Sequence, residues 1–355
     1  MGDLLRTLLF LEAGILGVLF LVLLAWPVVE RLIEARRQGQ RRDLLSAVWN
    51  HRRDDPPGEV LGALGDASPN ALLWSLEAVA DGILEADPLD LDGLVRETPA
   101  FGRLERAARS PFWWRRQTAA QLLAHVGHPD SDRPLLVSLL RDPHPAVSAA
   151  ALLTARDLGW PGLVEPLLEL ASEGGPATRG KETLLRDTLA AIEANVVPAL
   201  RSRLQATMGQ AEELTLLRIA GQLADEDLLP YLRERLRHGG LEVRIQAAKT
   251  LGETDLSGGV DALRDALQDP AWQVRTQAAR ALGELEAAEA ADDLYRSLSD
   301  PSWWVRLRAA LALRRLGEAG RKLLRSADPG EDQYAADMAQ FVLGLEDAAL
   351  REYAR

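Results

Sequence analysis

The chain contains no cysteine, which excludes a disulfide framework and any chemistry that depends on a thiolate. It also lacks runs in which Val, Ile, Thr or Tyr alternate with polar residues, so β-strands are poorly supported. Ala, Leu, Arg and Glu dominate instead. The formal net charge of −12 argues against nucleic acid as the main partner. These features together predict an all-α protein that does not bind nucleic acid.

Catalytic signatures are also missing: there is no Walker loop, dinucleotide fingerprint, nucleophile elbow or zincin motif. The histidines match no metal-binding spacing, although His125 and His128 lie near several acidic residues. The stretch 87–93 resembles a calcium loop only superficially, because Gly93 as its sixth position would make Pro88 the first ligand. We therefore expect a protein that is not an enzyme and needs no metal, cofactor or small-molecule substrate.

A fixed period is the strongest feature that is present. Arg244, Arg275 and Arg306 lie 31 residues apart, and each follows a valine and precedes a pair of alanines. A period in this range is typical of stacked helical repeats, in which each unit buries its apolar face against the next. The period therefore predicts an α-solenoid.

Other positions keep the same register. Helix starts combine a capping residue with proline, which is tolerated at the first position of a helix because its missing N–H would have no partner there. These starts are Ser110-Pro111, Asp142-Pro143, Asp269-Pro270 and Asp300-Pro301. Small alanine pairs would allow close helix packing, and leucines further along would fill the core between the layers.

The Asp-Pro starts, Val-Arg pairs, Ala-Ala pairs and closing leucines resemble the HEAT repeat, most closely the short bacterial variant also found in phycobilisome lyases. The resemblance covers residues 110–171 and 241–324 well and the rest loosely. It implies helical hairpins that hold other proteins. It leaves open an alternative, a lyase-like or chaperone-like protein that acts on its partner.

The pattern divides the chain into four parts. Residues 1–30 are predicted to form a transmembrane anchor, 31–53 a basic juxtamembrane helix or linker, 54–109 a degenerate helical capping subdomain, and 110–355 the HEAT-like solenoid. Within the solenoid, the Val-Arg signature fails over 172–240, which predicts an irregular middle. Residues 329–355 are expected to form a C-terminal cap.

The predicted anchor rests on an apolar run from Leu8 to Val29, long enough to span a bilayer as a helix. Arginines gather after the run, which predicts a short external N-terminus and a cytoplasmic solenoid, in a bacterial inner membrane. The reverse orientation would make the solenoid periplasmic. Within the run, Glu12 either snorkels to the interface or contacts a partner helix, for which Ala13 and Gly17 would allow close approach.

Two sets of side chains in the solenoid are candidates for function. Arg116, Arg244, Arg275 and Arg306 share one repeat position, and we interpret them as a structural ladder that pairs with acidic residues of neighbouring repeats. Ser148 replaces the arginine in one unit. The better candidates for partner contact are tryptophans near the helix starts: Trp113, Trp114, Trp272, Trp303 and Trp304. Adjacent helical residues point about 100° apart, so we expect one member of each Trp-Trp pair to pack between layers and the other to be exposed.

The sequence thus predicts a non-catalytic, membrane-anchored scaffold that organises a protein partner. The expected partner is an integral membrane protein or membrane enzyme, such as an envelope polysaccharide glycosyltransferase.

Overall fold

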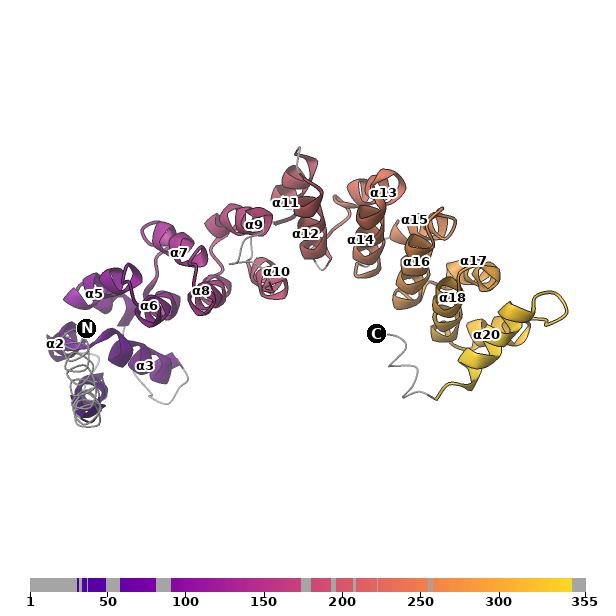
Figure 1. The fold of residues 1–355 in the computed structure, drawn as a ribbon. Coiled ribbons are helices and arrows are strands. Elements are labelled where there is room, and N and C mark those ends of the chain that lie inside the picture. Colours follow the sequence, from indigo (N-terminus) through magenta and orange to yellow (C-terminus); the bar gives the residue numbers. More distant parts are fainter. Residues whose placement is uncertain are drawn as a thin grey trace, which may run out of the picture. The chain divides into compact units, whose positions relative to one another are not determined.

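The structure is a computed structural model, and it describes residues 31–48 except 32, 33 and 37; 58–80; 91–173; 180–192; 196–206; and 209–346 except 222, 255 and 257. Every regular element within these ranges is a helix (Figure 1). The chain forms two compact units. Unit 1 comprises residues 1–139 and 146–154, and unit 2 comprises residues 140–145 and 155–355.

The first described residues of unit 1, which are 31, 34–36 and 38–48, are helical. The helices that follow in unit 1 are α2 Gly58–Asp66, α3 Pro69–Ala80, α4 Leu91–Arg96, α5 Pro99–Ala108, α6 Trp113–Val126 and α7 Arg133–Leu140. The next helix, α8 Pro145–Leu158, contributes residues to both units. Helix α6 packs against both α3 and α5, so the segment before residue 110 and the first clear repeat share one core.

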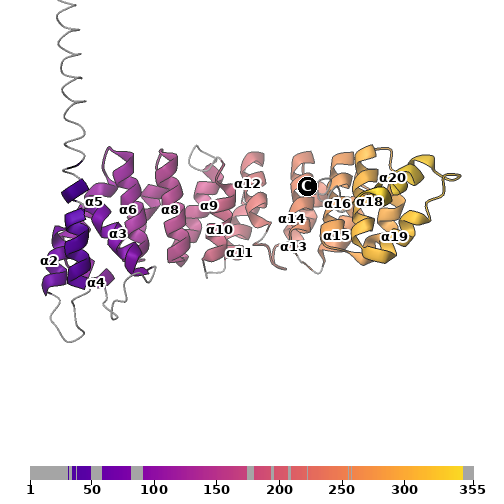
Figure 2. The same ribbon diagram turned by 90° about the horizontal axis from the view of Figure 1, so that it is seen from below.

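Unit 2 continues with helical hairpins and short 3-10 turns. Its helices are η1 Pro161–Leu163, α9 Val164–Glu173, α10 Glu182–Ala191, α11 Val196–Gln205, α12 Gln210–Ala220, α13 Leu229–His238, α14 Leu241–Gly252, α15 Gly259–Ala266, α16 Trp272–Glu284, η2 Ala288–Ala290, α17 Ala291–Arg296, η3 Ser297–Ser299, α18 Trp303–Arg315, α19 Gly317–Arg325 and α20 Gln333–Gly344. Helices α14, α16 and α18 lie side by side (Figures 1 and 2).

The aspartates of the repeat starts hold the chain as it enters a helix. An Asp269 carboxylate oxygen accepts a hydrogen bond from the Ala271 N–H at 2.8 Å, just before α16 begins. Asp300 accepts one from the Ser302 N–H at 2.8 Å, just before α18. Each carboxylate satisfies a backbone donor that has no partner within the helix. The sequence periodicity therefore recurs as a structural periodicity of helix starts.

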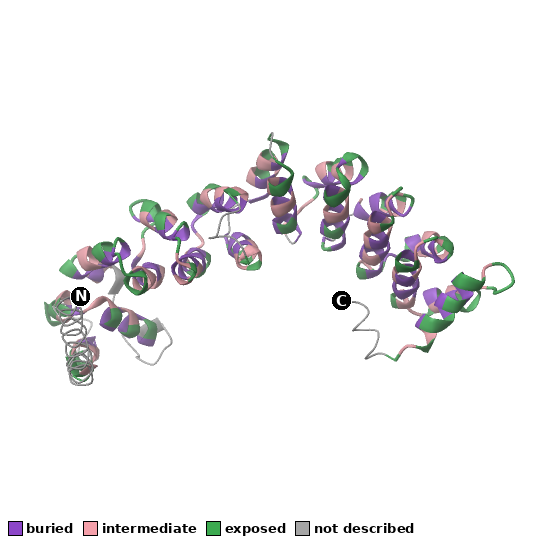
Figure 3. Cartoon of the chain, in the orientation of Figure 1, coloured by how far each residue is buried: buried purple, intermediate pink, exposed green. Residues whose placement is uncertain are grey.

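Small residues set the spacing between the long helices of unit 2. The alanine pairs of α14, α16 and α18 are fully buried, and Figure 3 shows the buried residues on these packed helices. A Cβ placed on Gly283 would lie 2.8 Å from the Cα of Ala312, and one on Gly252 would lie 2.9 Å from the Cα of Ala281. No side chain fits at either glycine unless the neighbouring backbone moves, so the two glycines, also 31 residues apart, permit the close approach.

Buried threonines add hydrogen bonds between successive layers. In unit 1 the Thr154 hydroxyl donates to the Ala120 carbonyl at 2.8 Å. In unit 2 the Thr250 hydroxyl donates to the Leu217 carbonyl at 2.9 Å. Both hydroxyls lie within the core, where an unpaired polar group would be costly. These bonds fix the register of one layer on the next.

The structure does not support the predicted transmembrane helix. Within the described residues, no helix is both long enough and apolar enough to cross a membrane. The repeat helices are too short, since α6 has 14 residues and α18 has 13, whereas a span needs about 20. The apolar run at 8–29 lies outside the described residues. The architecture that remains is an all-α fold built from successive helical hairpins.

The segments singled out by their irregular sequence are also helical. Helices α2 to α5 lie within 54–109, and α10 to α13 lie within 172–240. The Val-Arg signature is absent from 172–240, yet a partly buried ion pair is present: Glu213 of α12 accepts a hydrogen bond from Arg235 of α13 at 2.8 Å. It also accepts one from the Tyr231 hydroxyl at 2.8 Å. At the C-terminal end, α20 falls within the expected cap.

Candidate functional site

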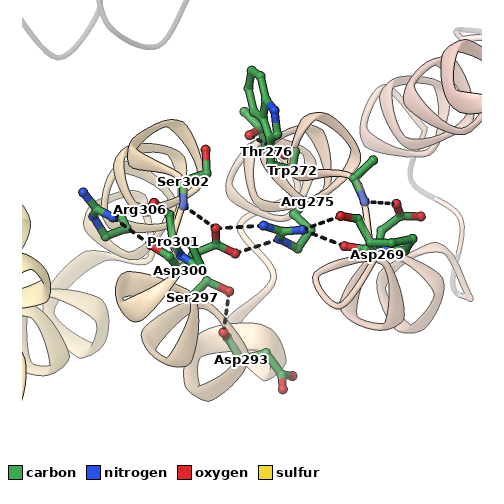
Figure 4. Close-up of polar contacts among 12 residues, drawn as sticks. Asp269, Trp272, Arg275, Thr276, Asp293, Ser297, Asp300, Pro301, Ser302 and Arg306 are labelled. Atoms are coloured by element: carbon green, nitrogen blue, oxygen red, sulfur yellow. Dashed lines mark hydrogen bonds and ion pairs between the residues drawn. The ribbon is translucent and has the colours of Figure 1, made fainter.

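Two arginines of the ladder in unit 2 form ion pairs between neighbouring repeats, and Figure 4 shows the pair of Arg275 with Asp300. Arg275 donates to both carboxylate oxygens of Asp300, from Nε at 2.7 Å and from Nη2 at 2.9 Å. Arg244 makes the same bidentate contact with Asp269 at 2.9 and 3.1 Å. Both acceptors are aspartates of the Asp-Pro helix starts, each in the repeat that follows its arginine. The bond to Asp300 raises the pKa of the Arg275 guanidinium above its ordinary value.

The same arginines also cap backbone carbonyls of their own repeat. Arg275 Nη1 donates to the carbonyls of Asp269 and Pro270 at 2.8 and 3.2 Å. In unit 1, Arg116 Nη1 donates in the same way to the carbonyls of Ser110 and Pro111. A guanidinium that bonds two carbonyls and a carboxylate has used most of its donors. The geometry therefore gives Arg275 a structural role, and Arg244, which bonds the Gly239 carbonyl at 2.9 Å as well as Asp269, shares it.

Arg306, the last arginine of the ladder, has a different environment. Its Nη1 donates to the carbonyls of Asp300 and Pro301 at 2.8 and 3.2 Å. Its guanidinium carbon lies 5.5 Å from the ring centroid of Tyr334, a cation–π distance. Its Nε is buried and has no hydrogen-bond partner. The ladder thus ends beside an aromatic ring instead of a bidentate carboxylate.

Both members of each Trp-Trp pair are exposed, contrary to the expectation that one would pack between layers. The exposed fractions are 44% and 51% for Trp303 and Trp304, and 39% and 50% for Trp113 and Trp114. Each pair opens its helix, so both indoles precede the buried face, which in α18 begins with Val305. Trp303 and Trp304 contact each other edge to face, with ring centroids 4.9 Å apart.

An exposed row of aromatic side chains runs along unit 2. Trp272, Trp303 and Tyr334 lie 31 residues apart in the first turns of α16, α18 and α20, and all three are exposed. With Trp304 they form what we call the aromatic row. It places large side chains at the same end of three successive long helices. An exposed apolar surface of this kind commonly marks a site of interaction.

The aromatic row ends in a pocket between α18 and α20, which we call the end pocket. It has a volume of about 380 Å³. Its lining residues are Trp303, Arg306, Tyr334, Asp337, Met338 and Phe341. The pocket offers aromatic walls, a flexible thioether and one cation, a combination suited to an apolar or aromatic side chain. Asp337 is held by the Gln333 amide at 2.7 Å.

The cap of α20 positions this pocket. Asp332 accepts hydrogen bonds from the N–H groups of Tyr334 and Ala335 at 2.9 and 3.1 Å. A hydrogen bond from Ser299 is the largest cause that lowers the pKa of the Asp332 carboxyl, and the backbone bonds add to it. The cap therefore fixes the first turn of α20, from which the Tyr334 side chain extends.

Unit 1 carries a second aromatic cluster at the start of α6. Trp114 stacks on Phe112 with ring centroids 4.7 Å apart, and it meets Trp113 edge to face at 6.1 Å. Trp74 of α3 is also exposed, and the guanidinium carbon of Arg41 lies 5.1 Å from the centroid of its ring. The predicted contact residues thus occur in two separate clusters, one in each unit.

The remaining sequence candidates fall elsewhere. Glu12, Ala13 and Gly17 lie outside the described residues. The Asp132 carboxylate, near the histidines considered as metal ligands, pairs with Arg96 and accepts from the His128 N–H at 2.8 Å. Ser148, at the arginine position of its repeat, is fully buried.

Sequence reasoning missed Tyr334 and Phe341. The period reaches Tyr334, but the Asp-Pro-x-Trp start of the earlier repeats becomes Glu331-Asp332-Gln333-Tyr334 there. An aromatic residue of any kind at the 31-residue spacing would have identified it. No repeat spacing identifies Phe341, because only the packing of α20 brings this side chain to the end pocket.

The repeat geometry agrees with the comparison to known families. A model of HEAT repeats matches residues 102–183, 197–276 and 260–344, which is more than half of the chain. This chain belongs to the HEAT-repeat family. The match covers most of the irregular middle as well as the regular repeats, and it names HEAT repeats in general, not the phycobilisome-lyase type.

Solved structures resemble the HEAT-repeat protein at low sequence identity. Human deoxyhypusine hydroxylase, solved with glycerol, is 18% identical with a TM-score of 0.32, and the match covers 81% of this chain and 98% of that one. Kap95p, studied for its binding to RanGDP, is 12% identical with a TM-score of 0.46, covering 84% and 46%. An engineered protein is 16% identical with a TM-score of 0.35, covering 89% and 97%. No curated protein sequence matches the chain.

The family assignment supports the prediction that this protein binds other proteins. HEAT repeats make this a helical-repeat protein suited to protein–protein interaction.

Proposed function

We propose that the chain is a non-catalytic scaffold that binds a protein partner along the aromatic row of unit 2. The observation that carries the proposal is the recurrence of exposed Trp272, Trp303 and Tyr334 at one repeat position. Packing of the repeat cores leaves each of these rings at the surface. Tryptophan and tyrosine dominate the energetics of protein interfaces when a partner buries them.

The rigidity of the row supports a docking role. Ion pairs and capped helix starts fix the helices that carry the rings, as in the bidentate contact of Arg275 with Asp300. A preorganised surface loses little conformational entropy when a partner binds. The end pocket then supplies a concave position for one anchoring side chain. Its aromatic walls favour a large apolar or aromatic residue of the partner.

The proposal defines the partner by this chemistry. The earlier expectation of a membrane enzyme rested on the predicted anchor, which no described helix supports. We therefore propose a protein that presents an apolar or aromatic anchor side chain.

Affinity isolation with the full chain tests the proposal. The wild type, Trp303→Ala and Trp74→Ala would be immobilised at equal loading in the lysate of the source organism. Trp74 is a matched control, because its exposed fraction of 38% is close to the 44% of Trp303 and it belongs to unit 1, whereas the row belongs to unit 2. We expect a partner recovered by the wild type and by Trp74→Ala, and about tenfold less recovery with Trp303→Ala. Equal recovery by all three proteins would contradict the proposal.

A further inference from the structure

A basic pocket lies between α3, α5 and α6 of unit 1. It has a volume of about 410 Å³, within the range of sites that hold small molecules or side chains. Its lining residues are Ser68, Pro69, Asn70, Arg103, Arg106, Ala107, Trp114, Arg115 and Thr118. Three of these residues are arginines and none is acidic, although the whole chain has a formal net charge of −12. The pocket is therefore a positively charged site on a protein whose net charge is negative.

Neutral backbone carbonyls hold Arg103 in place and leave its positive charge uncompensated. Its Nη2 donates to the carbonyl of Ala67 at 2.8 Å and also to the carbonyl of Gly65. These acceptors lie at and just beyond the end of α2, so they position the guanidinium at the pocket. A carbonyl is neutral, whereas a carboxylate partner would cancel the positive charge. Arg103 thus contributes a positioned cation.

Arg106 and Arg115 add two further cations from different helices. Arg106 lies three residues after Arg103, on the same face of α5. Its Nε donates to the carbonyl of Gly102 at 3.1 Å. The Arg115 guanidinium carbon lies 5.4 Å from the ring centroid of Phe112. No carboxylate within the described part of the chain forms an ion pair with any of these three arginines.

The remaining wall is aromatic and polar. Half of the Trp114 side chain is exposed, and its ring is braced by the stacked ring of Phe112. The Thr118 hydroxyl donates to the Asn70 side-chain oxygen at 3.1 Å, which ties α6 to the start of α3. Cations beside an indole face favour a ligand that carries both an anionic group and an apolar surface.

We propose that this pocket binds an acidic segment of a protein partner, with carboxylates against Arg103, Arg106 and Arg115 and an apolar side chain against Trp114. Arginine forks match carboxylate geometry bidentately, so the arrangement favours glutamate or aspartate side chains flanking a large apolar residue. The site is in unit 1 and uses none of the residues of the aromatic row, so it stands or fails independently of docking at unit 2.

Binding of a defined peptide to the full chain tests this site. The probe is a fluorescein-labelled Glu-Glu-Phe-Glu-Glu peptide, followed by fluorescence anisotropy, with Gln-Gln-Phe-Gln-Gln as the neutral comparison. Arg106→Glu is the test variant and Arg109→Glu the matched control. Arg109 is exposed, lies one turn further along and does not line the pocket, yet its substitution changes the net charge equally. Circular dichroism checks that both variants keep their helices.

We expect the acidic peptide to bind and the neutral peptide to bind at least tenfold more weakly. Arg106→Glu should weaken binding of the acidic peptide about tenfold to a hundredfold, because it removes charge-assisted hydrogen bonds, whereas Arg109→Glu should change it less than about twofold. Trp114→Ala should weaken binding without altering its salt dependence.

Three results would overturn the proposal. Equal losses with Arg106→Glu and Arg109→Glu would show diffuse attraction instead of a site. Equal binding of the neutral and acidic peptides would exclude recognition of carboxylates. If Arg106→Glu left peptide binding intact and abolished binding to vesicles that contain an anionic phospholipid, the ligand would be a lipid headgroup and not a protein segment.

Discussion

Replacement of Arg275 by alanine should destabilise unit 2 considerably more than loss of an ordinary surface ion pair. The variant removes two charge-assisted bonds to Asp300, at 2.7 and 2.9 Å, and two bonds to backbone carbonyls. The side chains of Arg275 and Asp300 are only 15% and 10% exposed. Water can therefore replace the lost contacts only in part, and Asp300 keeps just the bond from the Ser302 N–H.

The expected loss of unfolding free energy is about 2–4 kcal/mol, near the lower end of the range for breaking a buried pair. Arg237 provides a matched control, because it forms an ion pair with Asp265 at the same 2.7 Å while the two side chains are 59% and 63% exposed. Arg237→Ala should cost at most about 1 kcal/mol. The difference between the two variants isolates the effect of burial.

Urea unfolding of the full chain, followed by tryptophan fluorescence and circular dichroism, measures these losses. A double-mutant cycle with Arg275→Ala and Asp300→Ala should give a coupling energy of about 1–3 kcal/mol. If Arg275→Ala and Arg237→Ala cost the same, or if the cycle shows no coupling, the ladder does not join the repeats.

Three further variants test the packing of the repeats. Gly283→Ala should destabilise unit 2 by about 1–3 kcal/mol in urea unfolding, because the new Cβ would meet the Ala312 backbone at 2.8 Å. The control is Gly102→Ala in helix α5, where the space around the glycine is open, and it should stabilise the protein by about 0.5–1 kcal/mol. Thr250→Val should cost about 1 kcal/mol through loss of a buried hydrogen bond, and an unchanged urea midpoint would contradict that role. The pKa of Asp332 is lowered in the folded state, so its stabilising effect should be present above the unfolded value of about 3.9 and disappear as the pH falls through the folded pKa. The stability difference between wild type and Asp332→Asn should shrink over that window, and a difference independent of pH would refute the assignment.

Much of the fold could be predicted because each repeat packs its helices with the same residue types at the same positions. The Val-Arg period locates helices α14, α16 and α18, and the Asp-Pro starts locate the N-terminal ends of α16 and α18. The bidentate pairs follow from the same register, since the aspartate of one repeat start lies beside the arginine of the preceding repeat.

The candidate sites were less accessible from the sequence. Exposure of both Trp303 and Trp304 depends on their place in the first turn of α18, ahead of the packed face, and periodicity alone does not show this. The residues that line the basic pocket do not recur at the repeat spacing, because Arg103 and Arg115 converge only after α5 and α6 pack together. Side chains that meet through tertiary packing leave no local spacing signal.

Hydrogen–deuterium exchange of the full chain, with and without its isolated partner, tests most directly whether the aromatic row is the docking surface. Binding over the end pocket should slow exchange in the first turn of α18, around Trp303, and in α20 from Tyr334 to Phe341. The region around Trp74 should exchange at the same rate in both samples. Protection confined to helices outside the aromatic row would contradict the account.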